Sequence, residues 1–75
     1  MQLGASSTHT DLEVTAVAVP DAARLRLREI GVRVGARVRV TQRTSFGGRV
    51  VALAGTRVAL DRATAALIEV REVAP

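Results

Sequence analysis

The pattern of hydrophobic and polar residues changes its period in the middle of this chain. Before Gly31 the apolar residues recur at the helical spacing i, i+4 and i+7, which places them on one core-facing stripe: Ala23, Leu27 and Ile30. After Gly35, valine and arginine alternate, as residues do along a strand with one buried face. We therefore expect a helix that ends at Gly31 and a strand that starts after Gly35.

In the strand predicted over 36–43, Val38 and Val40 should point into the core, and Arg37 and Arg39 should point to water. A slip of one residue would bury the arginines, so the alternation strongly specifies the register. We interpret these arginines mainly as the wet face of a strand. A basic stripe for an acidic or phosphate-bearing partner is the other interpretation.

The rest of the chain is predicted to form mainly β-strands. Four more strands are predicted from runs of apolar and β-branched residues: 12–19, 49–54, 56–60 and 68–73. Asp21 is placed to cap the helix that follows the first strand, and Asp61 to cap a single helical turn over 62–66. This order is typical of a small SH3-like five-stranded barrel, with a short α-helix inserted between strands 1 and 2 and a single helical turn before the last strand.

Residues 1–11 are rich in Gly, Ser and Thr and have no period, which predicts a disordered N-terminal tail. The remaining residues, 12–75, should form one domain with a thin stability margin. We expect neither a signal peptide nor a membrane span. The start has no basic region followed by an apolar run, and no apolar run approaches the roughly 20 residues that a span needs.

Composition excludes most site chemistry. The chain has no cysteine and one histidine, His9, which lies in the predicted tail. Disulfides, zinc ribbons and thiol catalysis are therefore excluded, and a two-His-one-carboxylate iron site cannot form within one chain. The carboxylates are scattered, so an oxygen-only metal site would be weak. Ser6 and Ser7 lie near His9, but nothing in a disordered segment would hold them in catalytic geometry. We expect no enzyme, no cofactor and no metal site.

The formal charge is +4, and all eleven basic residues are arginine. This excess favours an acidic or phosphate-bearing partner only weakly. Phe46, the sole aromatic residue, lies at the tip of a hairpin loop that Gly47 and Gly48 close. It is either an exposed anchor for a partner or part of the core over an open barrel end. We favour burial, because burying a large apolar side chain gains about 1.5–3 kcal/mol.

Several segments carry a family resemblance, in order and in phase: 27–35 (LREIGVRVG), 38–40 (VRV), 46–48 (FGG), 55–60 (GTRVAL) and 66–70 (ALIEV). Together they resemble the FeoA family, small accessory proteins of bacterial ferrous-iron uptake, over about 12–73. Val34 and Arg49 stand where proline is common in that family, and the start lacks its usual leucine-and-glycine opening.

The resemblance implies a cytoplasmic, non-enzymatic FeoA-type SH3-like domain. It would act by contact with the cytosolic part of a membrane ferrous-iron permease that carries a GTP-binding domain. We choose four partner-binding candidates by residue type, since arginine and phenylalanine are favoured at interfaces: Arg24, Arg28, Phe46 and Arg49. No nucleic acid is expected, although a nucleic-acid- or ribosome-associated SH3-like module is the alternative. Weak transition-metal binding and a weak homo-oligomer also stay open.

Overall fold

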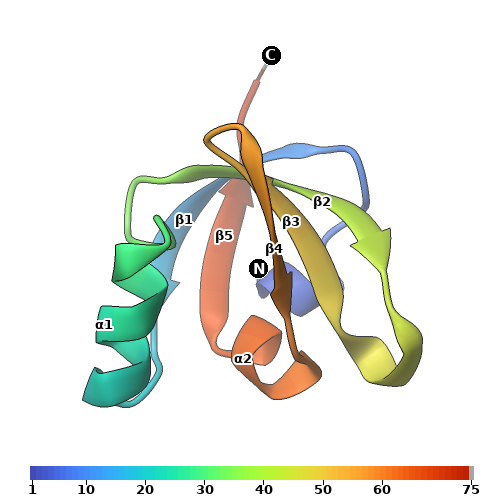
Figure 1. Ribbon diagram of the computed structural model, residues 1–75. Helices are drawn as coiled ribbons and strands as arrows, with labels where there is room; N and C mark the ends of the chain where they lie inside the picture. The colour runs from blue at the N-terminus through green and yellow to red at the C-terminus, as the bar shows by residue number, and fades with distance from the viewer. Residues whose placement is uncertain (75) are drawn as a thin grey trace.

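Five antiparallel strands form one strongly curled sheet in the order β4-β3-β2-β1-β5 (Figure 1). The strands are β1 (Asp11–Val17), β2 (Arg37–Arg43), β3 (Arg49–Leu53), β4 (Thr56–Leu60) and β5 (Ile68–Glu72). The helices are α1 (Asp21–Glu29) and α2 (Arg62–Ala66), and two 3-10 turns are η1 (Leu3–Ala5) and η2 (Ser45–Gly47). This computed structural model describes residues 1–74. The predicted strands, the inserted helix and the helical turn before the last strand are all confirmed.

The predicted closure of the sheet into a barrel is wrong. β4 and β5 lie at the two edges of the sheet and do not pair with each other. Register shifts in β1, between Val14 and Ala16, and in β2, between Val40 and Gln42, help the sheet to curl. Closure fails because α2, which connects β4 to β5, packs with η1 beside β5. The fold is therefore an open, SH3-like curled sheet.

The register of β2 is confirmed. Val38 is buried and Val40 has 0% of its surface exposed, whereas Arg37 and Arg39 are exposed. The alternation of valine and arginine thus matches the two faces of the sheet. The buried valines join a core that draws on every strand and on α1.

Two arginines of the wet face pair with carboxylates on β1. Arg39 donates from Nε and Nη2 to Asp11 Oδ1 at 2.9 and 2.6 Å. Arg71 of β5 donates to Glu13 Oε1 at 2.6 Å. Exposed pairs of this kind contribute at most about 1 kcal/mol each. They support the interpretation of these arginines as strand-face residues rather than as a free basic stripe.

The start of α1 differs from the prediction. Pro20 occupies the N-cap position and the side chain of Asp21 makes no capping hydrogen bond, so the predicted Asp21 cap is wrong. Asp21 is instead the first helical residue, where its charge is favourable at the positive end of the helix. The Asp21 Oδ1 atom also lies 3.6 Å from Arg24 Nη1. The helix ends as predicted, because Gly31 adopts a left-handed φ of 99°.

The predicted core-facing stripe of α1 is only partly confirmed. Leu27 is buried and Ala23 packs against the core, but Ile30 is 45% exposed. Ile30 lies outside the stripe because the helix ends at Glu29 and the chain turns before a further helical step is completed. Leu27 is the buried residue of α1, so the helix packs on the core mainly through this side chain.

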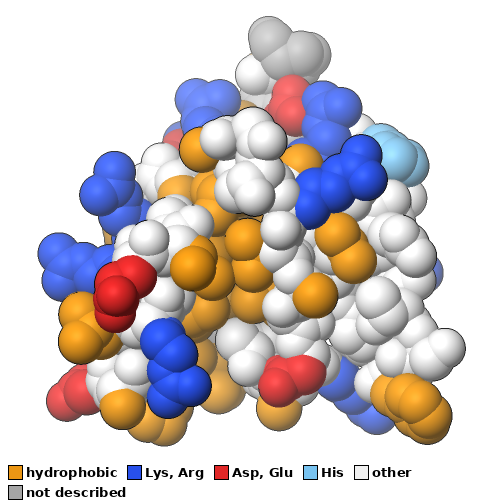
Figure 2. All heavy atoms as spheres, viewed as in Figure 1, with side chains coloured by type: hydrophobic (Ala, Val, Ile, Leu, Met, Phe, Trp, Pro, Cys, Tyr) orange, Lys and Arg blue, Asp and Glu red, His pale blue; other side chains and the backbone are white. Residues whose placement is uncertain are grey.

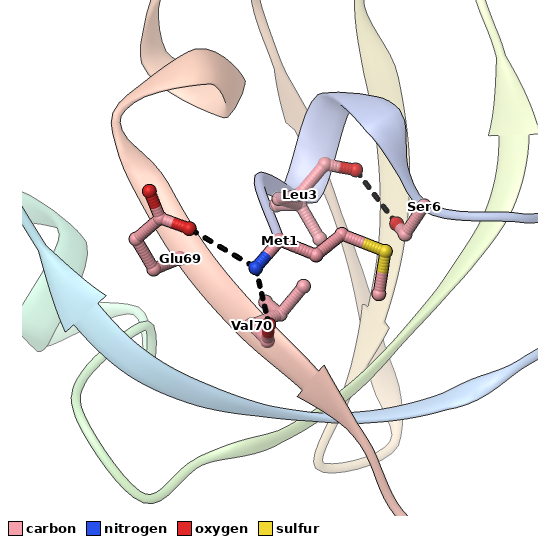
Figure 3. A network of polar contacts seen from close by, with 5 residues as sticks. All are labelled: Met1, Leu3, Ser6, Glu69 and Val70. Atoms are coloured by element: carbon pink, nitrogen blue, oxygen red, sulfur yellow. Dashed lines mark hydrogen bonds and ion pairs between the residues drawn. The ribbon is translucent and has the colours of Figure 1, made fainter.

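The N-terminal segment is folded, which corrects the predicted disordered tail over 1–11. Leu3 is only 1% exposed and belongs to the hydrophobic core. Ser6 is buried, and its Oγ donates to the Leu3 carbonyl at 2.7 Å (Figure 3). A single leucine among small polar residues has no period, so the sequence pattern carried no sign of its burial.

The same segment lies along the outer edge of β5. The Val70 amide donates to the Met1 carbonyl at 2.7 Å, and Gln2 forms a β-bridge with Glu69. The Met1 ammonium lies 3.3 Å from a Glu69 carboxylate oxygen (Figure 3). The folded domain therefore starts before residue 12. The predicted end of the domain, Pro75, lies outside the described residues.

Asp61 caps α2 as predicted, since its Oδ1 accepts a hydrogen bond from the Thr64 amide at 2.7 Å. Hydrogen bonds from the Thr64 backbone and side chain lower the pKa of the Asp61 carboxyl.

This lowered pKa predicts a pH-dependent cap. A depressed carboxyl pKa stabilises the fold above the unfolded-state value and loses that contribution as the pH falls through the folded-state value. In Asp61→Ala the thermal midpoint should therefore differ most from the unmutated protein near neutral pH, and the difference should shrink in acid. Thermal melts across the acid range measure this. A difference that does not change with pH would show that the charge of the carboxylate is not involved.

Candidate functional site

A groove of about 490 Å³ runs beside α1 and is lined by three arginines. Its walls come from β1, from α1 and from the loop that follows α1: Thr15, Ala16, Val17, Arg24, Arg28, Val32, Arg33 and Val34. We call it the arginine groove. Figure 2 shows several arginine side chains on the side of the molecule that carries α1.

The local structure explains how the arginines gather. Arg24 and Arg28 are four residues apart on α1, so they project from the same face of the helix. Arg33 joins them because the left-handed turn at Gly31 folds the loop back beside the helix. Three guanidinium groups from two segments thus line one concavity.

Two of these guanidinium groups are available to a partner. Arg24 donates from Nη2 to the carbonyl of Val19 at 3.2 Å and lies near Asp21. Arg28 and Arg33 form no ion pair with any residue in 1–74. Guanidinium groups bind carboxylates and phosphates in a bidentate geometry. The groove can therefore accept acidic groups at Arg28 and Arg33.

The groove also has apolar walls. Val17 is half-buried and Val32 is buried, while Val34 is largely exposed at the rim. Apolar walls between cationic groups lower the local screening by water and strengthen an ion pair formed there. The combination suits a protein segment that carries acidic residues together with an apolar side chain.

Phe46 lies elsewhere and is 96% exposed, so the predicted burial is wrong. Gly47 meets Arg62 of α2, where an added Cβ would lie 2.9 Å from Arg62 Cδ. The hairpin tip is thus packed through Gly47, which leaves Phe46 on the outside with a left-handed φ of 64°. An exposed aromatic residue on strained backbone is a candidate anchor. The loop that joins β2 to β3, which carries this residue, lies on the opposite side of the molecule from α1 (Figure 1).

Arg49 is engaged within the chain. Its Nη1 donates to the carbonyls of Gly47 and Gly48 at 2.8 and 2.9 Å, and its Nη2 donates to the carbonyl of Gly4. These bonds tie the β2–β3 hairpin to η1. The structure therefore brings Arg24 and Arg28 together, and it separates them from both Phe46 and Arg49.

Sequence reasoning did not single out Arg33. The residue was part of the FeoA-like segment 27–35, but it follows the helix and has no helical neighbour in the sequence. A signal was present nonetheless, since Gly31 predicts a reversal of the chain at the helix end. Such a reversal places the next basic residue beside the last turn of α1.

The carboxylates and the histidine do not form a metal site in the part of the chain that the structure describes. Across residues 1–74, no three side chains of His, Cys, Asp or Glu lie close enough together to hold a metal ion. No helix within residues 1–74 is long and apolar enough to cross a membrane.

The FeoA domain family model matches residues 1–72, including the N-terminal segment that packs on β5. Among solved structures, the FeoA protein of Chlorobium tepidum is 31% identical, with a TM-score of 0.91 over 99% of this chain and 71% of that chain. A Stenotrophomonas maltophilia FeoA complexed with zinc is 33% identical, with a TM-score of 0.78 over 95% of this chain and 89% of that chain. That protein is described as a prokaryotic SH3 domain protein and a candidate activating factor for ferrous-iron transport.

Part of a manganese-dependent transcriptional repressor in complex with manganese has the same fold. It is 30% identical, with a TM-score of 0.84 over 97% of this chain but only 36% of the repressor. No curated protein matches this chain by sequence. The Stenotrophomonas protein is complexed with zinc, whereas within residues 1–74 of this chain no three His, Cys, Asp or Glu side chains are grouped as metal ligands.

Proposed function

Because this chain belongs to the FeoA family, whose model matches residues 1–72, we propose that it is a cytoplasmic accessory protein of bacterial ferrous-iron uptake. It acts without catalysis, by contact with the cytosolic part of a ferrous-iron permease. The Stenotrophomonas relative, a candidate activating factor for ferrous-iron transport, supports this direction. A regulator of that kind needs a docking surface rather than a reaction centre.

The arginine groove is the observation that carries the proposal. Arg28 and Arg33 form no ion pair within residues 1–74, and valine side chains flank them. An acidic segment of the permease would pair with both guanidinium groups and bury Val34 at the rim. Arginine is one of the residue types that are enriched at protein interfaces.

Charge reversal in the groove tests the proposal. Arg28→Glu should weaken binding of the permease's cytosolic domain by about tenfold or more, because it replaces an attractive pair with a like-charge contact. Isothermal titration calorimetry on the full chain measures the affinity. Arg43→Glu is the matched control, since Arg43 is an exposed arginine on β2 outside the groove and the net charge changes equally.

Two results would contradict the proposal. One is the absence of any binding of the permease domain to the unmutated protein at high micromolar concentration. The other is equal weakening by Arg28→Glu and by the Arg43→Glu control. The nucleic-acid alternative predicts salt-dependent binding of RNA or DNA instead, which the same titrations with oligonucleotides detect.

A further inference from the structure

The chain covers one edge of its sheet and leaves the other uncovered. At β5, the N-terminal segment occupies the outer edge through the hydrogen bond from Val70 to Met1 and the bridge between Gln2 and Glu69. At β4, the backbone groups of 57–59 bond to no element other than β3 within residues 1–74. An uncovered strand edge is a row of hydrogen-bonding groups that another extended chain can use.

The hairpin before β4 determines which groups point outward. The β3–β4 loop consists of two residues, Ala54 and Gly55, both with left-handed φ. Two-residue loops of this type are closed by a hydrogen-bonded pair, here Leu53 and Thr56. Hydrogen-bonded and non-hydrogen-bonded pairs then alternate along an antiparallel ladder. The amides and carbonyls of Arg57 and Ala59 therefore point away from β3.

A second groove, of about 320 Å³, adjoins this edge. We call it the apolar groove, and its lining comes from α1, β4 and α2: Ala23, Arg26, Leu27, Ile30, Val58, Ala59, Leu60, Asp61 and Thr64. Figure 2 shows hydrophobic side chains in the hollow between α1 and β4. Ile30, exposed at the end of α1, and Val58 of β4 face this space from opposite sides. The groove thus lies where a strand added to β4 would place its side chains.

The charges around the apolar groove favour an acidic occupant. Arg26 lines the groove and Arg57 is exposed on the edge strand, and neither forms an ion pair with any residue in 1–74. The one carboxylate in the lining, Asp61, already accepts the Thr64 amide. An acidic side chain on the occupant would therefore meet unpaired guanidinium groups.

We propose that β4 binds an extended segment of a partner protein as an added strand. An apolar side chain of that segment fills the apolar groove, and an acidic side chain pairs with Arg26 or Arg57. A second copy of this chain fits less well, because pairing two β4 edges brings two Arg57 side chains to the same short ladder. The inference goes beyond the proposed function. Strand addition at β4 uses backbone hydrogen bonds, so it does not require that the permease be the partner.

A designed peptide tests the inference without the permease. The probe is a nine-residue acetylated and amidated peptide in which valine alternates with glutamate and threonine. In a titration followed by ¹⁵N NMR on the full chain, we expect shifts at Arg57, Ala59 and Ile30. We also expect slowed exchange of the Ala59 amide proton, because that proton becomes hydrogen-bonded.

The decisive variant is Ala59→Pro, which removes the outward amide. Proline is tolerated on an edge strand where the amide faces solvent, so the fold should persist. Peptide binding should weaken about tenfold, while Ala59→Thr, which keeps the amide, should bind normally. If Ala59→Pro does not fold, the same peptide N-methylated at alternate residues makes the comparison on the unmutated protein, and it should bind about tenfold more weakly.

Several results would overturn the inference. The peptide could fail to bind at millimolar concentration, or bind Ala59→Pro and unmutated protein equally. Shifts confined to the arginine groove, or self-association that perturbs β4 without peptide, would do the same. These outcomes leave the permease titration untouched, so the two proposals fail independently.

Discussion

Val40→Asp should unfold the protein. Val40 is fully buried in β2 and pairs with Val51 of β3 in the middle of the sheet. The substitution places a carboxylate in the core with no partner, a change among the few that destabilise by more than about 4 kcal/mol. A domain of this size has only about 5–10 kcal/mol of stability and a small core to absorb the loss. Circular dichroism and a thermal melt should show a chain that is unfolded or close to it.

The neighbouring residue supplies the control. Arg39→Asp removes the ion pair with Asp11 and sets two carboxylates opposite each other, but on the exposed face of the sheet. The expected loss is about 1 kcal/mol, because water screens exposed charges. The variant should therefore stay folded at a somewhat lower thermal midpoint. If Val40→Asp and Arg39→Asp had equal effects, the assigned register of β2 would be wrong.

Leu3→Ala should have the second-largest effect, although it lies in a segment whose sequence suggests a tail. Leu3 is buried in the same core as Val40 and anchors the segment that covers the edge of β5. Truncating a buried leucine costs about 2–5 kcal/mol, because a cavity remains. For a domain of this size that loss lowers the thermal midpoint by about 10 °C or more. Differential scanning fluorimetry measures the shift.

Gln2→Ala is the matched control, since the Gln2 side chain is exposed and its β-bridge uses backbone groups. Its midpoint should stay close to that of the unmutated protein. Small and equal effects of Leu3→Ala and Gln2→Ala would support a disordered tail instead of a docked segment.

Elements set by neighbouring residues were predictable. The alternation around Val40 gave the faces of β2, and Gly31 gave the end of α1. Asp61 was recognised as the cap of α2, because an N-cap acts on an amide three residues away. Asp21 looked equally suitable, yet the chain uses Pro20 as the N-cap. Pro20 and Asp21 are adjacent, and the sequence pattern does not show which of them occupies the N-cap position of α1.

The candidate site was only half predictable. Arg24 and Arg28 share a helical face by spacing alone, and both line the arginine groove. Arg33 joins them only because the loop folds back. Phe46 was expected in the core on hydrophobicity, but the packing of Gly47 against Arg62 leaves its side chain outside. The contact between Gly47 and Arg62 joins residues far apart in sequence, so no local pattern predicts it.

The sequence by itself determined the mainly β character, the strand parity and the helix ends, because these depend on side-chain alternation and on backbone preferences over a few residues. Only the tertiary structure decided that the sheet stays open, that Leu3 enters the core and that β4 keeps a free edge between α1 and α2. Those outcomes depend on which distant elements compete to cover the same apolar surface and the same backbone groups. A local sequence pattern cannot predict these outcomes, because contacts between distant elements contribute free energy only once those elements pack together.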